Sequence, residues 1–415
     1  MLSIEGIIVL EEGQMRKRVE IDTETGLIVR VAEPSGSADV VLGNSELVFP
    51  GFIDLHVHAR EDAGHTQEYK EDFKSASAAA INGGLVAFAD MPNNVVPPVD
   101  DASYEAKRVL ADTAPIEIVL YAGIGPHTNP LARAVPYKAF MGHSIGDLFF
   151  SSREELDATL ERYRGQRVSF HAEDPKIMDE HKGDTTHESR RPKEAEISAV
   201  DIALALIEKH SLVGKICHAS TVEAIAKITA AKARGVSVSV EVTPHHLYFD
   251  EAMFGDRVPV RFQVNPPIRQ TRENRLGLIE ALKRGDIDYL ATDHAPHSKE
   301  EKEQGMSGLT HLDTYGPFTT WLMQEHGFRP EDITRVCANA PGRFISEFTP
   351  EKYGKIQEGY VGSLTVLSPN TPILIRSEDL QTKCKWSPFE GIEFPGRVTM
   401  TIIKGAILKN EHHEK

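Results

Sequence analysis

The middle of the chain repeats one pattern, in which a short apolar run typical of a strand is followed by a longer run with the apolar spacing of a helix. About eight such pairs over roughly 250–300 residues match the size of a (β/α)8 barrel. We therefore predict an α/β fold of the TIM-barrel class, with a doubly wound open sheet as the alternative. The predicted strands end near His58, Met91, Ile124, Met141, Glu173, Ser220, His246 and His297. The predicted helices cover residues 71–81, 102–111, 153–163, 192–210, 221–234 and 272–283.

Both ends of the chain carry short β-like runs that turn residues separate. We predict that residues 1–48 and 350–415 together form a small β domain and that residues 49–349 form the barrel. The β-like runs occupy residues 4–10, 18–21, 27–31, 363–367 and 398–403.

A His-x-His pair ends the first predicted barrel strand. Residues 47–55 before it are mostly apolar, β-branched or aromatic, which favours a buried strand. Alternate residues of a strand point to the same side, so His56 and His58 can direct two imidazoles at one metal ion. The alternative interpretation is two ordinary histidines, one of them hydrogen-bonded in a core.

Further ionisable residues recur at the ends of later predicted strands, where barrels of this class place their functional groups. Imidazole and carboxylate ligands suit two divalent metal ions that share one hydroxide. Asp293 could bind one metal and also take a proton from that hydroxide. The alternative is a set of structural polar residues. Besides the His-x-His pair, the set consists of Lys138, His171, His218 and Asp293.

Composition narrows the choice of partners and compartment. The formal net charge of −16 disfavours nucleic acid and anionic membranes, although a local cluster of cations could still bind an anionic substrate. The 3 cysteines are odd in number and widely spaced, which favours a reducing compartment over a disulfide framework. We find no signal peptide, no membrane-spanning run and no Gly-x-Gly-x-x-Gly dinucleotide motif after the first strand. We therefore expect a cytoplasmic protein that acts on a small molecule.

Motifs of one family are spread over nearly the whole chain. They lie at residues 51–60, 90–93, 138, 170–173, 217–219, 241–246, 265–267, 292–297 and 386–391. With these motifs the chain resembles the dihydroorotases of the amidohydrolase superfamily. The His-x-His pair and Asp293 are shared by many superfamily members. The Ala-Pro-His run at 295–297 and the Trp-Ser-Pro-Phe-Glu-Gly run at 386–391 point more narrowly to dihydroorotases.

The resemblance implies two zinc ions that Lys138 bridges after carbon dioxide has carboxylated it to N6-carboxylysine. A carbamate on Lys138 would also replace a positive charge beside two metal ions by a negative one. The remaining ligands would be His56, His58 and Asp293 on one ion and His171 and His218 on the other.

The resemblance also implies the reaction, which is the reversible cyclisation of N-carbamoyl-L-aspartate to L-dihydroorotate in pyrimidine biosynthesis. The substrate carboxylate would meet Arg60, Asn93 and His297, and Asn265 would also contact the substrate. Arg60 is two residues past His58 and could share its side of the strand, and a guanidinium can bind a carboxylate bidentately. The alternative for Arg60 is a surface salt bridge.

Two other functions are weighed against this one. Dihydropyrimidinases and allantoinases share the metal set but bind rings without the same carboxylate, so Arg60, Asn93 and His297 favour a dihydroorotase. An inactive homologue could serve as a structural partner of aspartate transcarbamoylase, but every expected metal position is filled here. The oligomeric state and any association with aspartate transcarbamoylase are left open by the sequence.

A loop after the fourth predicted strand carries a narrower prediction. Gly142 and Gly146 bracket Ser144. We predict that this loop closes on the substrate and that the Ser144 hydroxyl contacts it. The alternative is an ordinary connecting loop.

One departure from the family pattern and one open question concern residues near the predicted site. Thr310 and His311 stand where Glu-Thr is frequent in the family, which leaves the substrate contacts of that loop open. Cys217 and Glu241 could bind a third metal, although a buried small hydrophobe is the better explanation of Cys217.

Overall fold

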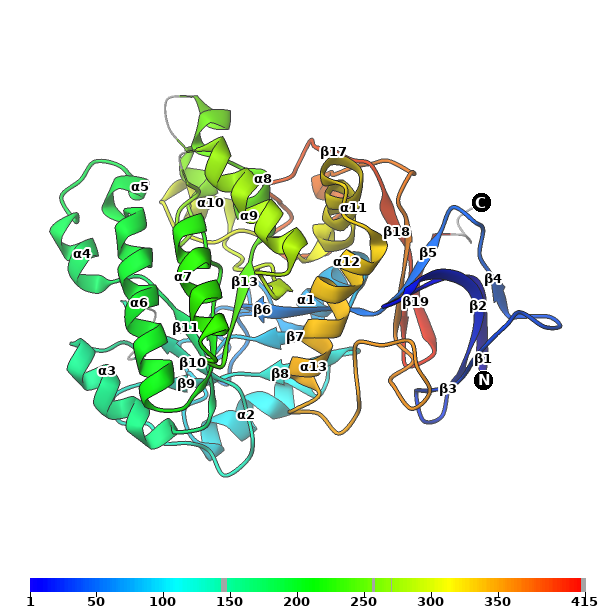
Figure 1. The fold of residues 1–415 in the computed structure, drawn as a ribbon, viewed down its shortest axis with the longest axis horizontal. Helices are drawn as coiled ribbons and strands as arrows, with labels where there is room; N and C mark the ends of the chain where they lie inside the picture. Colours follow the sequence, from blue (N-terminus) through cyan, green and yellow to red (C-terminus); the bar gives the residue numbers. More distant parts are fainter. Residues whose placement is uncertain (143–147, 256–257, 270, 412–415) are drawn as a thin grey trace.

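The computed structural model describes residues 1–142, 148–255, 258–269 and 271–411, and its largest part is a parallel barrel (Figure 1). Strands β6 (Phe52–Val57), β7 (Leu85–Asp90) and β8 (Glu117–Leu120) pair in parallel, as do the strands of a second group. A parallel bridge between Val57 and His294 joins β6 to the segment after the last strand, as a closed barrel requires. The second group consists of β9 (Ala122–Ile124), β10 (Tyr137–Phe140), β11 (Arg167–His171), β12 (Val213–Ile216), β13 (Val238–Val242) and β14 (Tyr289–Leu290).

Helices follow most of these strands and cover the outside of the barrel (Figure 1). Every predicted helix is present and begins within two residues of its predicted start. Side-chain caps explain several starts: Asp72 accepts a hydrogen bond from the backbone N of Ser75, and Thr221 accepts one from that of Ala224. The longer helices described are α1 (Phe73–Asn82), α2 (Asp101–Ala111), α3 (Arg153–Leu160), α6 (Lys193–Lys209), α7 (Val222–Ala233), α9 (Arg272–Arg284) and α11 (Tyr315–His326). The shorter ones are α4 (Pro175–Glu180), α5 (His187–Arg190), α8 (Pro244–Tyr248), α10 (Lys299–Glu303), α12 (Pro330–Thr334) and α13 (Ala340–Ile345).

Three of the predicted strand ends lie too far along the chain. Strand β12 ends at Ile216 rather than near Ser220. Strand β13 ends at Val242 rather than near His246, because Thr243 caps a new helix by accepting a hydrogen bond from the backbone N of His246. Strand β14 contains only Tyr289 and Leu290, so His297 lies on the loop that follows and not at a strand end. The backbone of Asp293 in that loop has a φ of 50°, which an extended strand cannot contain.

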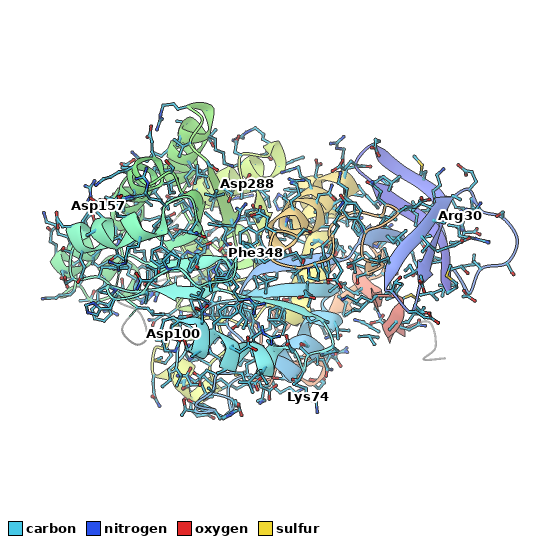
Figure 2. All side chains as sticks on the ribbon, turned by 90° about the horizontal axis from the view of Figure 1, so that it is seen from below. Arg30, Lys74, Asp100, Asp157, Asp288 and Phe348 are labelled. Atoms are coloured by element: carbon cyan, nitrogen blue, oxygen red, sulfur yellow. The ribbon has the colours of Figure 1, made fainter. Side chains whose placement is uncertain are left out.

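A second sheet joins the two ends of the chain. Its strand order is β19-β18-β15-β5-β1-β2-β3, so β5 from the N-terminal part lies between β1 and β15. Buried Ile8, Val48 and Met400 belong to a core separate from that of the barrel. In Figure 1 the N-terminus lies at this sheet, which also contains β19, and in Figure 2 Arg30 of β3 and Asp157 of α3 mark opposite ends of the molecule. The strands are β1 (Leu2–Leu10), β2 (Gly13–Asp22), β3 (Leu27–Ala32), β4 (Val40–Val41), β5 (Leu47–Pro50), β15 (Leu364–Ser368), β18 (Arg397–Ile403) and β19 (Ala406–Asn410).

The sheet agrees with the β-like runs that the sequence predicts at both ends, while the domain boundaries at residues 49 and 350 stay a prediction. A short pair of strands, β16 (Ile373–Leu374) and β17 (Glu393–Phe394), lies between β15 and β18 in the chain. Among the described residues, no helix has the length and apolar character that a membrane crossing needs.

Candidate functional site

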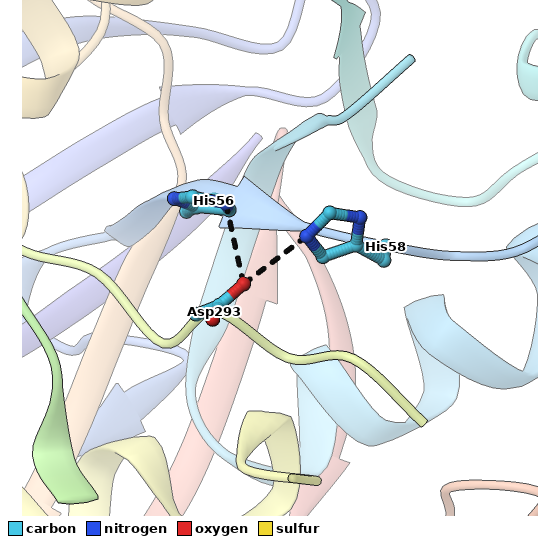
Figure 3. Close-up of side chains that lie close together, drawn as sticks. All are labelled: His56, His58 and Asp293. Atoms are coloured by element: carbon cyan, nitrogen blue, oxygen red, sulfur yellow. Dashed lines mark hydrogen bonds and ion pairs between the residues drawn. The ribbon is translucent and has the colours of Figure 1, made fainter. Parts of the chain in front are cut away.

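Two predicted histidine ligands converge on one carboxylate oxygen of the third predicted ligand, Asp293 (Figure 3). Nε2 of His56 lies 3.2 Å from Oδ1 of Asp293, and Nε2 of His58 lies 3.1 Å from the same atom. His56 is 1% exposed, and His58 and Asp293 are each 8% exposed. Two imidazoles and one carboxylate are therefore within reach of a single divalent cation, in a site that excludes most of the solvent.

The electrostatic surroundings keep these imidazoles neutral. Burial and the Lys138 ammonium lower the pKa of His56 well below its usual value, and burial and the Arg60 guanidinium do the same for His58. A neutral imidazole has the free lone pair that a metal ion requires. Burial raises the pKa of the Asp293 carboxyl to about 7, so a cation next to it would favour the ionised form.

The other predicted ligands adjoin this group. Nδ1 of His171 is 3.0 Å from Nε2 of His218, and the ring centroids of His218 and His56 are 5.2 Å apart. Lys138 is fully buried, and its Nζ donates to Sγ of Cys217 at 2.8 Å. Within the described part of the chain, no carboxylate lies at ion-pair distance from the Lys138 amine. A buried lysine without an acidic partner is unusual and indicates a special role.

One cavity of about 350 Å3 brings these residues together with the predicted substrate contacts. Every predicted site residue that the structure describes lines it. Ser144, the predicted lid residue, lies outside the described residues. The predicted residues in the cavity wall are His56, His58, Arg60, Asn93, Lys138, His171, His218, Asn265, Asp293 and His297.

Buried carboxylates lie behind two of the candidate ligands. Oε1 of Glu241 is hydrogen-bonded to Nδ1 of His56, and Oε2 pairs with the Lys215 ammonium. Such a carboxylate fixes the ring orientation of a metal-binding histidine and raises its basicity. No local sequence pattern marks Lys215, because its partner lies on the neighbouring strand.

A similar arrangement supports His171. Its Nε2 lies 2.9 Å from Oε2 of Glu173, which also pairs with Arg191. Burial alone would raise the pKa of Glu173, but Arg191 and His171 outweigh it and lower the pKa to about 2. Glu173 therefore stays ionised and can orient the imidazole. The sequence contains it in a family motif but does not distinguish it from a ligand.

The side chains considered for a third metal are already occupied. Cys217, Glu241 and His56 do lie close enough to share an ion. However, burial raises the pKa of the Cys217 thiol to about 11, and Glu241 is held by Lys215. A protonated thiol is a poor metal ligand, so the arrangement supports the interpretation of Cys217 as a buried small side chain.

The other end of the cavity carries an unpaired guanidinium. Arg60 is only 4% exposed, and its Nε donates to the carbonyl oxygen of Pro296 at 3.3 Å. Of the carboxylates in the described ranges, none lies at ion-pair distance from Arg60. The backbone φ of Arg60 is 65°, so the residue lies past the end of β6 and does not extend the strand as its i+2 spacing predicts. A buried cation without an acidic partner favours an anionic ligand.

Three uncharged side chains accompany this guanidinium. Nη2 of Arg60 lies 3.3 Å from Nε2 of His297. Burial and the cations Arg60 and Lys70 lower the pKa of His297 to about 3, so its imidazole is neutral. The buried Oδ1 atoms of Asn93 and Asn265 have no hydrogen-bond partner within the described chain. The cavity therefore offers unused polar groups to a small polar molecule.

His311, the departure noted in the sequence, lies outside the wall of this cavity. Its Nε2 is 3.0 Å from Nδ1 of His245, and its backbone N donates to Nδ1 of His294. Residues 305–308 of the same loop do line the cavity. The change at His311 therefore alters the packing behind the loop rather than the cavity wall.

Comparison with known proteins agrees with the predicted resemblance. The sequence model of the amidohydrolase family matches residues 47–408 of this chain. A dihydroorotase of Thermococcus kodakarensis is 34% identical over 395 residues, which are 94% of this chain and 90% of that protein. A dihydroorotase of Pyrococcus furiosus is 30% identical over 414 residues, 99% of this chain and 90% of that protein. One from Staphylococcus aureus strain Mu50 is 30% identical and covers 96% of this chain and 97% of its own.

Solved structures confirm the fold. The L-hydantoinase of Arthrobacter aurescens superposes with a TM-score of 0.89 at 22% identity and covers 99% of this chain and 96% of its own. A D-hydantoinase from Thermus sp. gives a TM-score of 0.82 at 21% identity, with coverage of 99% and 96%. At this level of identity the likeness concerns the fold, and the predicted α/β barrel with an added β part is confirmed.

Proposed function

The chain belongs to the amidohydrolase family, and on that premise we propose that it is a dihydroorotase. The reaction is the reversible cyclisation of N-carbamoyl-L-aspartate to L-dihydroorotate and water. Relatives named dihydroorotase at 30–34% identity over nearly the whole chain support this choice. The proposal places the protein in pyrimidine biosynthesis in the cytoplasm, as a homo-oligomer or in association with aspartate transcarbamoylase.

The donor set fits two divalent metal ions. His56, His58 and Asp293 would hold one zinc ion, and His171 and His218 would hold the other. Their close approach, their neutral imidazoles and the buried carboxylates behind them support this assignment. When bound, the metals would activate a water molecule and polarise the amide carbonyl of the ring.

Lys138 is proposed to bridge the two ions as N6-carboxylysine. Its full burial and the lack of a carboxylate partner in the described chain support this role, because a buried ammonium without a counter-charge is costly, whereas a carbamate would bring negative charge to the two cations. We expect Lys138→Ala to retain one metal ion per chain instead of two, as measured by elemental analysis. A variant that keeps both metals would contradict the bridge.

Other steps of the reaction, proton transfer and substrate binding, are assigned to side chains of the cavity wall. Asp293 would move a proton between the attacking water and the ring nitrogen, because its carboxylate has a second oxygen besides Oδ1, the one that faces the two imidazoles. Arg60, Asn93 and His297 bind the substrate carboxylate and thereby orient the ring, with Asn265 as a further contact.

The buried, unpaired guanidinium of Arg60 is the observation that carries the choice of substrate. Dihydropyrimidinases and allantoinases act on rings without the same carboxylate, for which an uncompensated cation in the cavity wall would be a cost. An inactive homologue would have no reason to keep all the proposed metal ligands in one cavity wall.

Turnover of three ring substrates on one metal-analysed sample tests the proposal. We expect hydrolysis of L-dihydroorotate to exceed that of dihydrouracil and allantoin by at least about 100-fold in kcat/KM, the size of one charge-assisted contact of about 3 kcal/mol. Faster turnover of dihydrouracil or allantoin would instead favour a related cyclic amidohydrolase. No turnover at full metal content would favour the inactive partner.

A further inference from the structure

An ion pair between buried Lys70 and partly buried Glu301 lies behind His297, at the ring nitrogen opposite Arg60. Nζ of Lys70 lies 2.9 Å from Oε1 of Glu301 and 3.4 Å from Nδ1 of His297. Oε2 of Glu301 is also 3.4 Å from Nδ1 of His297. Neither Lys70 nor Glu301 lines the cavity, so each can act on a ligand only through His297 or through its charge.

The pair is rigidly held. Lys70 is 3% exposed. The hydroxyl of Tyr69 donates to Oε1 of Glu301 at 2.7 Å, and the backbone N of Ser298 donates to Oε2 at 3.0 Å. Burying an ammonium in this way is costly, and hydrophobic side chains could fill the same space. The arrangement therefore calls for an explanation other than stability.

The hydrogen-bonding capacity of His297 offers an explanation for this ion pair. A neutral imidazole has one donor nitrogen and one acceptor nitrogen. As the side chains lie, Nη2 of Arg60 faces Nε2, so Nε2 accepts and the Nδ1 hydrogen faces Glu301. If Arg60 turns to a bound carboxylate, Nε2 must carry the hydrogen to donate to that carboxylate, and Nδ1 must accept one. The ammonium of Lys70 is the donor placed to provide it.

The charges lead to the same conclusion. Arg60 and Lys70 are cations, Glu301 is an anion and His297 is neutral, so these four contacting side chains carry a net charge of +1. One carboxylate balances that charge. Without Lys70 the group would be neutral before the ligand binds and negative afterwards.

We propose that Lys70 and Glu301 are positioning residues for carboxylate recognition: together they let His297 act as an Nε2–H donor while it stays uncharged, and Lys70 supplies the second cation. The inference rests on the proposed function, because it assigns to this end of the cavity the substrate carboxylate. It places substrate selectivity partly in residues that never contact the substrate.

Removing the Lys70 charge tests the inference. We expect Lys70→Met to raise the KM for L-dihydroorotate, and the Kd of the unreactive carboxylate analogue orotate, by about 10- to 100-fold in parallel. The kcat should stay within about threefold of the parent value, because the residues proposed for the chemistry are untouched. Lys70→Gln, which keeps a hydrogen-bond donor for Glu301 but not the charge, should behave in the same direction and covers the case in which Lys70→Met does not fold.

Lys74→Met is the matched control, because Lys74 is exposed on α1 and the substitution removes the same charge four residues further along the chain (Figure 2). It should leave KM, Kd and kcat unchanged. The inference is overturned if a folded Lys70 variant with full metal content keeps its KM and orotate Kd within twofold of the parent values, or if kcat falls while KM does not change. Failure of the proposed function would be visible in the parent protein, as no dihydroorotate turnover, before any variant is compared.

Discussion

The two ends of the cavity differ in the charge of the side chains that surround them. At the metal end, buried carboxylates lie behind the imidazoles, with Glu241 on His56 and Glu173 on His171. At the other end, Arg60 has no carboxylate at ion-pair distance within the described chain, and Lys70 adds a second cation. One end is therefore prepared for cations and the other for an anion, inside a chain whose overall charge is −16. The comparison shows that net charge predicts the partners of the outer surface and not those of a buried site.

If the two ends of the cavity have independent roles, a substitution at the metal end should alter kcat and a substitution at the anion end should alter KM. The largest effect is expected for Asp293→Asn, which keeps the shape of the side chain but removes the proposed proton carrier. We expect kcat for dihydroorotate to fall by about 100- to 10,000-fold, the usual contribution of general acid–base catalysis. The Kd of orotate should change by less than about tenfold, the effect of roughly one kcal/mol. A kcat within tenfold of the parent value would remove Asp293 from the proton transfer.

A second variant removes the carboxylate support of the metal end. Glu241→Gln leaves the Lys215 ammonium buried without its partner, which should lower the free energy of unfolding by about 3–5 kcal/mol. Zinc affinity should also fall by about 10- to 100-fold, because the orientation of His56 is lost. Urea unfolding and competition with a zinc chelator measure the two effects.

Glu105→Gln is the control for that variant, because it breaks an exposed ion pair with Arg108 on α2. It should change neither stability nor zinc affinity appreciably. Equal stability losses in the two variants would show that the Glu241 pair is no more important than a surface one.

At the anion end, Arg60→Lys keeps the charge but loses the planar fork of the guanidinium. We expect carboxylate binding to weaken by about 1–3 kcal/mol. The KM for dihydroorotate and the Kd of orotate should rise together, while metal content and the turnover of a ring without the carboxylate stay nearly unchanged. Equal losses for both kinds of ring would show that Arg60 does not bind the carboxylate.

The smallest effect concerns pH. Burial alone would raise the pKa of Glu301, but hydrogen bonds from Tyr69 and Lys70 outweigh it and lower the pKa to about 2. A depressed pKa contributes stability that is fully present above the unfolded-state pKa and is lost as the pH falls through the folded-state value. Between about pH 5 and 2 the parent protein should therefore lose about 1–2 kcal/mol more stability than Glu301→Gln. Thermal melts of both proteins across that pH range measure the difference. Parallel curves of stability against pH would show that the neighbours of Glu301 do not lower its pKa.

The sequence predicts the barrel and most of the helix limits because its patterns are local. Apolar spacing distinguishes strand from helix, and cap residues such as Asp72 and Thr221 mark helix starts. The family motifs then identify residues that all line one cavity in the structure. Strand ends are harder to predict: Thr243 and Pro244 end β13 early, and the loop of Asp293 leaves the extended conformation.

The sequence by itself determined which residue types stand at the site: the His-x-His pair, the later histidines, Lys138, Asp293 and Arg60. Only the tertiary structure decided how each one is supported. Arg60 enters the cavity through a left-handed backbone rather than along a strand, and Lys70 reaches His297 across 227 residues of sequence. The physical reason lies in what a local pattern can encode. The periodicity of apolar residues gives the direction of a side chain relative to its own helix or strand. An ion pair between distant segments forms only after barrel closure has brought them together and excluded water from between them.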